Sequence, residues 1–328
     1  MAEETANPVK YTDKDDAVHP MNTDEYYEWW YFDGVFDNGY TCALSYFWRN
    51  YFTKPPIPGV LLDIYTPEGK RLRGFAGYNS KDCTASLERC DVKLGDNFAR
   101  QEGEQYKVRL HAHKIGAELT FKPIVPGWKG VEGCWIVYDD TGKQAWVNAI
   151  PRGSVTGTLY IDGKPVSVTG QGYHDHNWGD RNMHDSMAGW CWGRMYDDIY
   201  TFQYGWLLPV NETQKIMPLL FVAKGSQGIV NTIDVEYIEE KKELHEESGN
   251  IVPTDLTLKC KTADADISIH IKILKYLGCE KMVGVAKFPL YYYRRLASYD
   301  AVVIYKGNTD RVSGEAINEY TYLSPVGK

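Results

Sequence analysis

Short segments in which apolar and polar residues alternate constrain the fold of this chain more than any other feature. Residues 106–112 and 266–273 alternate in this way, which is typical of half-buried β-strands. Turn-forming residues separate such segments, for example at 37–39 and 162–164. Convincing helical periodicity is nearly absent. The pattern predicts an all-β protein with antiparallel sheets and few short helices.

A weak internal repeat suggests how the chain is divided. Residues 30–41 match residues 190–201 after a shift of 160 positions, and both copies consist of an aromatic strand, an acidic turn and a second aromatic strand. Chance similarity between two hairpins is the alternative. If each copy opens one barrel, closure removes exposed sheet edges, and a barrel of about eight strands holds one small ligand. We expect a polar arm at 1–25 and barrels at 26–182 and 183–328.

Charge and cysteine content narrow the functional classes. The formal net charge of −8 and the lack of a long basic run argue against nucleic-acid binding, which needs a basic surface. The seven cysteines are odd in number and show no CxxC spacing, which predicts reduced thiols rather than disulfides or a zinc site. The sequence shows no signal peptide and no apolar run near the roughly 20 residues of a membrane helix. We expect a cytoplasmic protein without a membrane span.

The densest group of chemically active residues is the segment Gly-Tyr-His-Asp-His-Asn-Trp-Gly at 172–179. In a strand, His174, His176 and Trp178 share one face, whereas Asp175 lies on the other face. Two imidazoles and an indole make a poor apolar core unless they line a cavity. The segment is therefore our first candidate for a functional site.

Three interpretations of this segment compete. A His-x-His pair on a strand presents two nitrogens to one metal ion, but a third ligand is needed. Candidates for that ligand are Asp180, His184 and Asp185. The other such pair, His111 and His113, lies on a face that looks solvated. Alternatively, the polar side chains only satisfy backbone groups beside a turn. In the third interpretation, which we favour, His176 is a general acid or base, Asp175 or a neighbouring carboxylate tunes a histidine, and no metal is bound.

A second unusual segment begins at Glu28, which precedes four aromatic residues. Alternation places Glu28, Trp30 and Phe32 on one face. A carboxyl group among rings loses solvation, which raises its pKa and lets it donate a proton near neutral pH. The neighbouring rings would stabilise a cationic intermediate. The alternative is an aromatic barrel floor in which Glu28 pairs with an arginine.

Further aromatic residues are candidates for contacts with a substrate. Together with His174, Trp178 and Trp30, these candidates are Trp190, Trp192, Tyr200 and Tyr204. No phosphate-binding glycine loop and no serine-hydrolase elbow occur in the sequence. Nucleotide chemistry and serine-hydrolase chemistry are therefore unsupported.

Several segments together resemble one known family. They are Glu-Trp-Trp-Tyr at 28–31, the stretches at 157–170, Tyr-His-Asp-His-Asn-Trp-Gly at 173–179, and Glu-Tyr-Thr at 319–321. In these segments the chain resembles the lipocalin-like carotenoid 1,2-hydratase and AttH superfamily, which also includes fungal hydratases and lipocalin-like Diels–Alderases. The resemblance covers about 28–323. It implies two tandem lipocalin-like antiparallel β-barrels, with a hydrophobic ligand in a cavity near their junction.

In the hydratase branch of that superfamily, a double bond is protonated and water captures the cation. The resemblance implicates His176 and Trp178, which match the family's His-Asn-Trp segment. That branch also has an acidic residue beside a tyrosine on a following strand, where this chain reads Phe-Gln-Tyr-Gly at 202–205. Candidates to replace that carboxylate are Asp175, Asp197, Asp198 and Glu28. The cyclase branch relies mainly on shape and hydrogen bonding, so this departure affects it less.

The function that we expect is enzymatic. The substrate would be a lipophilic unsaturated small molecule, an isoprenoid or a polyketide, and the reaction hydration, isomerisation or cyclisation without a cofactor. The expected catalytic residues are His176, Asp175 and Glu28. The alternative is a carrier that binds a hydrophobic ligand and does no chemistry, because barrels of this size commonly hold lipophiles.

Overall fold

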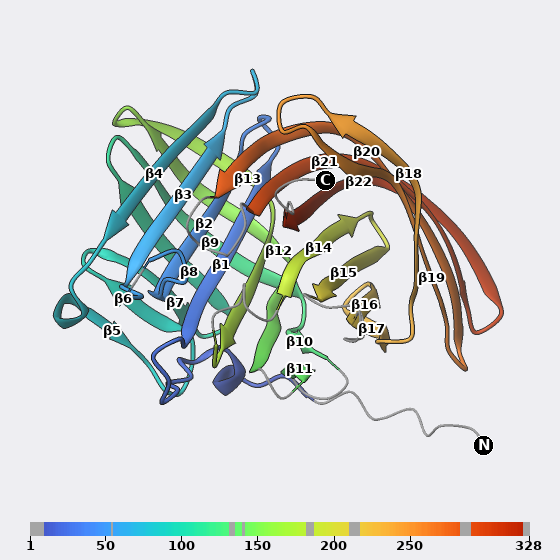
Figure 1. Ribbon diagram of the computed structural model, residues 1–328, viewed down its shortest axis with the longest axis horizontal. Helices are drawn as coiled ribbons and strands as arrows, with labels where there is room; N and C mark the ends of the chain where they lie inside the picture. The colour runs from blue at the N-terminus through green and yellow to red at the C-terminus, as the bar shows by residue number, and fades with distance from the viewer. Residues whose placement is uncertain are drawn as a thin grey trace. The chain divides into compact units, whose positions relative to one another are not determined.

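The protein folds into two compact units made almost wholly of antiparallel strands (Figure 1). The computed structural model describes residues 10–53, 55–130, 135–139, 142–181, 187–209, 217–282 and 290–323. The units are Met1–Met183 and His184–Lys328. Among the described residues, the only helical elements are two short 3-10 helices, η1 (Asp13–Asp16) and η2 (Ser80–Asp82). The predicted all-β fold with two tandem lipocalin-like barrels is confirmed.

The sheet of the N-terminal unit has thirteen strands. In chain order they are β1 (Tyr27–Phe36), β2 (Thr41–Arg49), β3 (Gly59–Tyr65), β4 (Arg71–Gly77), β5 (Cys83–Ala85), β6 (Asp91–Leu94), β7 (Asn97–Glu102), β8 (Gln105–Ala112), β9 (Ile115–Val125), β10 (Trp128–Lys129), β11 (Trp135–Asp139), β12 (Gly142–Ile161) and β13 (Lys164–Gly179). Across the sheet the order is β4-β3-β2-β1-β13-β12-β9-β8-β7-β6-β5, and β10 and β11 pair with β12. The first strand therefore pairs with the last.

The sheet of the C-terminal unit has nine strands. They are β14 (Met187–Tyr196), β15 (Tyr200–Pro209), β16 (Met217–Lys224), β17 (Gln227–Thr232), β18 (Glu236–His245), β19 (Asn250–Lys261), β20 (Ala265–Met282), β21 (Leu290–Tyr305) and β22 (Asn308–Leu323). Their order is β17-β16-β15-β14-β22-β21-β20-β19-β18, so here too the first strand, β14, pairs with the last, β22.

The internal repeat corresponds to the hairpin that opens each sheet, but the shift of 160 positions does not match all inward faces. Leu44 of β2 and Tyr204 of β15 both lie in their cores, as the shift requires. On the preceding strands the match fails, because Trp30 belongs to the first core whereas on β14 the core residue is Cys191, next to Trp190. The connecting turns differ by one residue (37–40 against 197–199), and a slip of one residue reverses the faces of a strand.

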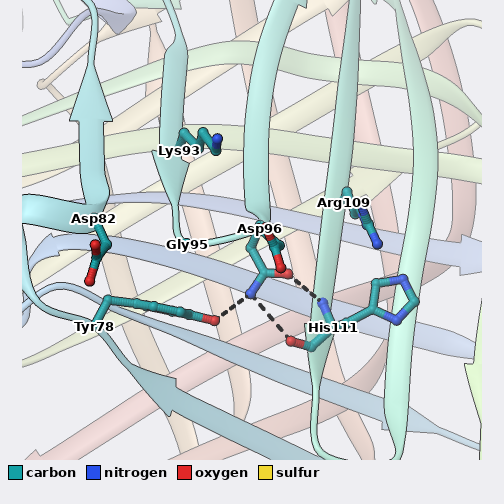
Figure 2. Close-up of a pocket in the computed structure, with 8 residues that line it drawn as sticks. Tyr78, Asp82, Lys93, Gly95, Asp96, Arg109 and His111 are labelled. Carbon is teal, nitrogen blue, oxygen red and sulfur yellow. Dashed lines mark hydrogen bonds between the residues drawn. The ribbon is translucent and has the colours of Figure 1, made fainter.

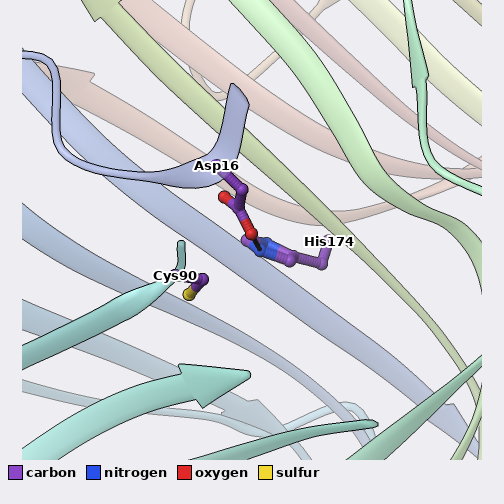
Figure 3. A group of neighbouring side chains, drawn as sticks. All are labelled: Asp16, Cys90 and His174. Atoms are coloured by element: carbon purple, nitrogen blue, oxygen red, sulfur yellow. Dashed lines mark hydrogen bonds and ion pairs between the residues drawn. The ribbon is translucent and has the colours of Figure 1, made fainter. Parts of the chain in front are cut away.

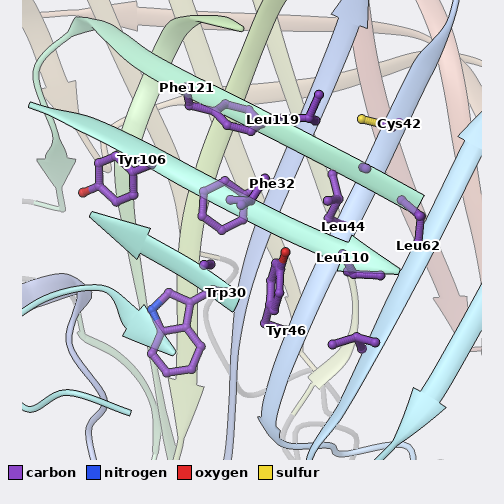
Figure 4. Close-up of a cluster of buried hydrophobic side chains, with 14 of the residues drawn as sticks. Trp30, Phe32, Cys42, Leu44, Tyr46, Leu62, Tyr106, Leu110, Leu119 and Phe121 are labelled. Carbon is purple, nitrogen blue, oxygen red and sulfur yellow. The ribbon is translucent and has the colours of Figure 1, made fainter. Parts of the chain in front are cut away.

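Each sheet curls around a hydrophobic core of its own. In the first core, large side chains from β1, β2, β8 and β9 meet, as Figure 4 shows for Phe32, Tyr46, Leu110 and Phe121. Phe32 makes an edge contact with Tyr46, with ring centroids 6.1 Å apart. In β8 and in the first half of β20, buried residues alternate with more exposed ones, as the sequence predicts. No helix among the described residues is long and apolar enough to cross a membrane.

The segment before β1 packs against the first barrel. Thr12 and Asp15 close the single turn of η1, since the Asp15 carboxylate accepts hydrogen bonds from the Thr12 backbone N–H and hydroxyl. The Trp30 indole N–H donates to the Asp16 carbonyl over 2.9 Å, and the Val18 N–H donates to the carbonyl of Ser86. The part of the predicted polar arm that the structure describes therefore carries a buried carboxylate, Asp16, into the barrel.

Candidate acid–base site in the N-terminal barrel

The segment at 172–179 forms the end of β13, and its side chains alternate as the sequence predicts. His176 lies opposite Trp30 of β1 and His174 lies opposite Phe32. The His176 ring stacks on Trp30 with centroids 4.3 Å apart, and the His174 ring stacks on Phe32 at 3.8 Å. Both histidine side chains are fully buried. Aromatic packing therefore holds both imidazoles in fixed orientations inside the barrel.

His174 is held between a carbonyl and a carboxylate. Its Nδ1 lies 2.9 Å from the Tyr31 carbonyl oxygen, and its Nε2 lies 2.9 Å from Asp16 Oδ2 (Figure 3). A carbonyl oxygen only accepts hydrogen bonds, so Nδ1 carries a hydrogen. The contact between His174 Nε2 and Asp16 is fully buried, so water does not compete for it.

His176 has a carboxylate at each ring nitrogen. Its Nε2 lies 3.0 Å from Glu28 Oε1, and its Nδ1 lies 3.4 Å from Asp16 Oδ1. These four side chains, which we call the histidine row, therefore alternate in the order His174, Asp16, His176, Glu28. The positive charge that His176 carries when it is protonated is therefore compensated by a carboxylate on either side of its ring.

Glu28 connects this buried row to a partly exposed histidine. Its Oε1 accepts a hydrogen bond from the His19 backbone N–H over 2.8 Å and lies 3.3 Å from the His19 ring Nδ1. Its Oε2 accepts a hydrogen bond from the Tyr26 hydroxyl. The His19 side chain is 27% exposed and stacks flat on Trp178, with centroids 3.7 Å apart. Among the groups named here, His19 is the member of the network that reaches solvent.

The pKa shifts follow from these contacts. Burial alone would raise the pKa of Asp16, but His174 and His176 outweigh it and lower that pKa to about 2. Burial likewise acts to raise the pKa of Glu28, yet hydrogen bonds from His176 and His19 lower it. Burial would lower the pKa of His176, but Asp16 and Glu28 raise it. The expectation of a raised pKa for Glu28 is therefore wrong, because its histidine partners outweigh its desolvation.

These shifts predict how stability depends on pH. The depressed pKa of Asp16 contributes stability that is present above its usual value of 3.8 and is lost as pH falls toward 2. The raised pKa of His176 contributes stability that is present below 6.5 and is lost as pH rises through the elevated value. We expect the stability advantage of the wild type over Asp16→Asn to be largest between about pH 4 and 6.5. Urea unfolding of both proteins from pH 3 to 9 measures this difference in the free energy of unfolding. A difference that stays constant with pH would show that charges in the histidine row do not contribute to stability.

Asp175 lies on the opposite face of β13. Its carboxylate accepts hydrogen bonds from the Trp146 indole over 3.0 Å, the Tyr173 hydroxyl over 2.8 Å and the Asn177 amide over 2.9 Å. The carboxylates that contact the two histidines are instead Asp16 and Glu28. Asp175 is thus anchored in a network of its own on the outer side of the strand.

The aromatic candidates of the second half all belong to the C-terminal unit. Tyr200 and Tyr204 lie in its core, where the Tyr200 hydroxyl donates to Asp310 and the Tyr204 hydroxyl lies 2.5 Å from the Asn318 amide. Trp190 and Trp192 are on the other face of β14, alternating with the core residue Cys191. These four residues therefore belong to the C-terminal unit. Within the N-terminal unit, the residues that come together are Trp30, Trp178, His174, His176 and Glu28.

Three groups of described residues have the composition of a metal site: Asp16, Cys90 and His174; His19, Glu28 and His176; and, in the C-terminal unit, His245, Glu247 and Cys279. In the first two groups, hydrogen bonds already engage histidine and carboxylate atoms, and burial raises the pKa of the Cys90 thiol, which disfavours the thiolate that binds metal. The ligands suggested from the sequence lie elsewhere. Asp180 accepts the Lys143 backbone N–H, His111 contacts Glu118, His113 is exposed, and His184 and Asp185 lie outside the described residues.

Several surface pockets lie on the same barrel, one of them lined by His113 and Lys114. Of two others, the first is polar and is lined by residues that include Tyr78 and His111 (Figure 2), and the Asn97 amide donates hydrogen bonds to the Tyr78 hydroxyl and the His111 carbonyl. The second is lined by residues that include Tyr11, Ile124 and Tyr106. The Tyr106 ring contacts His174 edge to face, with centroids 5.2 Å apart. The Tyr106 ring therefore lies between the second pocket and His174.

The network contains three residues that the sequence reasoning missed: Asp16, His19 and Tyr26. All three precede β1, in a segment without regular periodicity. The one available signal was the Ala-Val pair at 17–18, an apolar interruption flanked by Asp16 and His19 in an otherwise polar stretch. Such an interruption indicates a point where a polar segment packs against the core.

Comparison with known proteins identifies the family. A family model described as AttH-like matches residues 71–275, more than half of the chain. The chain belongs to the AttH-like family. A hydroxyneurosporene dehydrogenase of Chlorobaculum tepidum is 35% identical over 226 residues, which are 55% of this chain and 56% of that protein. The chain thus spans about half the length of that curated relative.

Solved structures share the fold of this AttH-like chain. A putative AttH from Nitrosomonas europaea has a TM-score of 0.70 at 16% identity, covering 98% of this chain and 99% of its own. Kievitone hydratase from Nectria haematococca has a TM-score of 0.62 at 12% identity, covering 98% and 95%. CghA in complex with Sch210972 has a TM-score of 0.70 at 12% identity, covering 98% and 96%. At sequence identities this low, the comparisons show that the folds are alike.

Proposed function

We propose that this AttH-like protein is an enzyme that adds a proton to a lipophilic, unsaturated small molecule, leading to hydration, isomerisation or cyclisation. One observation carries the proposal. His176 is fully buried between two carboxylates, and through Glu28 it connects to His19, which is partly exposed. A charged row of this kind is costly to bury, so its retention inside a barrel supports a chemical role.

The proposed proton route follows the contacts. His176 holds a proton on Nε2 toward Glu28, and the same Glu28 oxygen lies 3.3 Å from His19 Nδ1. His19, with its hydrogen on Nε2, donates that hydrogen to a double bond at the exposed end, while Nδ1 takes up a proton that His176 passes through Glu28. When the cation takes up water or loses a neighbouring hydrogen, the released proton returns to Nε2 and the reverse transfer restores His176. Trp178, stacked on His19, and Trp30, stacked on His176, stabilise neighbouring positive charge through their ring faces. Addition of a proton and of water leaves the oxidation state unchanged, so the proposed reaction needs no redox cofactor.

The other predicted residues have narrower proposed roles. Asp175 stays a candidate catalytic carboxylate, now on a separate face with three donors around it. Trp190, Trp192, Tyr200 and Tyr204 stay candidates for substrate contacts, and so does the ligand cavity implied near the barrel junction. The names of two relatives, a kievitone hydratase and a hydroxyneurosporene dehydrogenase, agree with a lipophilic substrate such as an isoprenoid or a polyketide.

Turnover in D₂O tests the proposal and separates its branches. The protein is incubated with a panel of linear polyenes, isoprenoids and unsaturated polyketides, and products are analysed by mass spectrometry. Hydration adds the mass of water with one deuterium on carbon, and acid-assisted isomerisation exchanges hydrogen for deuterium at constant skeleton. Pericyclic cyclisation incorporates no carbon-bound deuterium. We expect deuterium on carbon, and a product formed without it contradicts proton addition.

The second candidate function is a carrier for a hydrophobic ligand. It is favoured by the two enclosed cores and by the apolar lining of one pocket. Native mass spectrometry of freshly purified protein distinguishes the two functions. Recovery of a tightly bound lipophile in unchanged form, with no turnover across the panel, supports the carrier over the enzyme.

A further inference from the structure

The C-terminal barrel contains a fully buried arginine in its interior. Arg295 lies on β21 between Tyr293 and Ala297, which are core residues of the same strand face, and its side chain has no exposed surface. Its Nε donates to Asn318 Oδ1 and its Nη1 donates to the Pro253 carbonyl, both over 2.7 Å. Its Nη2 is buried and has no acceptor in hydrogen-bond geometry among the described residues.

The charge of Arg295 has no counter-ion within the part of the chain that the structure describes. Its two acceptors, an amide and a backbone carbonyl, are neutral. Its neighbour Arg294 points to the other face of the strand, where it pairs with Glu319 over 2.5 Å. A guanidinium is always protonated, and an isolated buried charge costs several kcal/mol. The site is therefore incomplete without an anion.

The surroundings of Arg295 are aromatic. The guanidinium lies 5.2 Å from the centroid of the Tyr320 ring. Burial raises the pKa of the Tyr276 phenol, while the charge of Arg295 and a direct interaction between the two side chains lower it, so Tyr276 lies beside the guanidinium as a neutral neighbour. Asn318, which holds Arg295, also donates to the Tyr204 hydroxyl. Rings and an apolar core disfavour a strongly hydrated ion and favour an anion attached to an apolar body.

We propose that Arg295 binds the carboxylate of a lipophilic monocarboxylic acid inside the C-terminal barrel. The unsatisfied Nη2 donates to one carboxylate oxygen, and the alkyl or aryl body packs among the tyrosines. The planar guanidinium suits carboxylates because its donors match their two oxygens. This site is in the other unit from the histidine row, so it does not depend on the proposed function.

Calorimetric titration with dodecanoate and with dodecan-1-ol tests the site, since the two probes differ only in their head group. We expect wild type to bind the acid more tightly than the alcohol. Arg295→Gln is expected to weaken binding of the acid roughly 10- to 100-fold and to leave binding of the alcohol nearly unchanged. The matched control is Arg311→Gln, because Arg311 is an exposed arginine of the same unit.

A second measurement uses only the wild type, in case Arg295→Gln does not fold. The carboxyl carbon of ¹³C-labelled dodecanoate is titrated by NMR in the complex, and we expect its pKa to be lower than that of the free acid, because a buried cation favours the carboxylate. Equal affinity for acid and alcohol, an unshifted carboxyl pKa, or displacement of dodecanoate by inorganic phosphate at equal concentration would each overturn the proposal.

Discussion

Replacing Asp16 with alanine is expected to lower the free energy of unfolding by about 3–5 kcal/mol at pH 6. Asp16 is fully buried, and its two oxygens face His174 at 2.9 Å and His176 at 3.4 Å. Removal of the carboxylate leaves an uncompensated positive charge or an unsatisfied imidazole nitrogen inside the barrel, and it also leaves a cavity. Urea unfolding, with the midpoint and slope fitted together, measures the loss.

Two further variants define what the Asp16 carboxylate contributes. Asp16→Asn should cost less than Asp16→Ala, because its amide donates to a neutral His174 Nε2 while its oxygen accepts from His176. Asp13→Asn is the matched control in the same helical turn, where the exposed carboxylate accepts a hydrogen bond from Gln101, and it should stay within about 0.5 kcal/mol of wild type. If Asp16→Ala matches Asp13→Asn, the buried row does not stabilise the fold.

Substitution of His176 by glutamine is expected to lower kcat roughly 10²–10⁴-fold on any substrate that the protein turns over, the usual contribution of one positioned proton donor or acceptor. Glutamine can still donate one hydrogen bond toward Glu28, but its amide does not take up or release a proton near neutral pH. KM should change little, because His176 is fully buried and is linked to the solvent side through Glu28 and His19. Steady-state kinetics with the substrate from the D₂O panel measures both constants.

The control for this variant is His111→Gln. His111 lies in the same barrel, pairs with Glu118 near the surface and is remote from the row in its contacts. Its kcat should equal that of wild type. Circular dichroism and the unfolding midpoint establish that His176→Gln is folded at the assay temperature. A folded His176→Gln protein with unchanged kcat removes His176 from the proposed proton route.

The sequence predicts what depends on local pattern. Strict alternation placed His174, His176 and Trp178 on one face of a strand, and the same rule placed Glu28 and Trp30 together on another. Alternation and the spacing of turns likewise predict an antiparallel all-β fold, whereas its lipocalin-like character was implied by the family resemblance. That these two faces meet depends on the pairing of β1 with β13, which joins residues far apart in the chain.

The chemistry of the site depends on contacts that no local pattern encodes. Asp16 and His19 belong to an irregular segment, where periodicity gives no face assignment. The pKa of Glu28 was predicted in the wrong direction because its aromatic neighbours in sequence suggested desolvation alone. Its histidine partners decide the sign. The sequence also suggested that Asp175 or a neighbouring carboxylate tunes a histidine. In the structure, Asp16 and Glu28 contact His176, and Asp175 lies on the opposite face with donors of its own.

The pairing of the first strand with the last in each sheet bears on how the chain acquires its structure during synthesis. Glu28 meets His176 across 148 positions, and Asp16 meets His174 across 158. Contacts of such high sequence separation make folding slow, because a long loop must close before they form. While the ribosome is still adding β12, β1 has β2 as a neighbour but lacks β13, so one edge stays open to mispairing. The buried charges of the row come together only when β13 closes that edge.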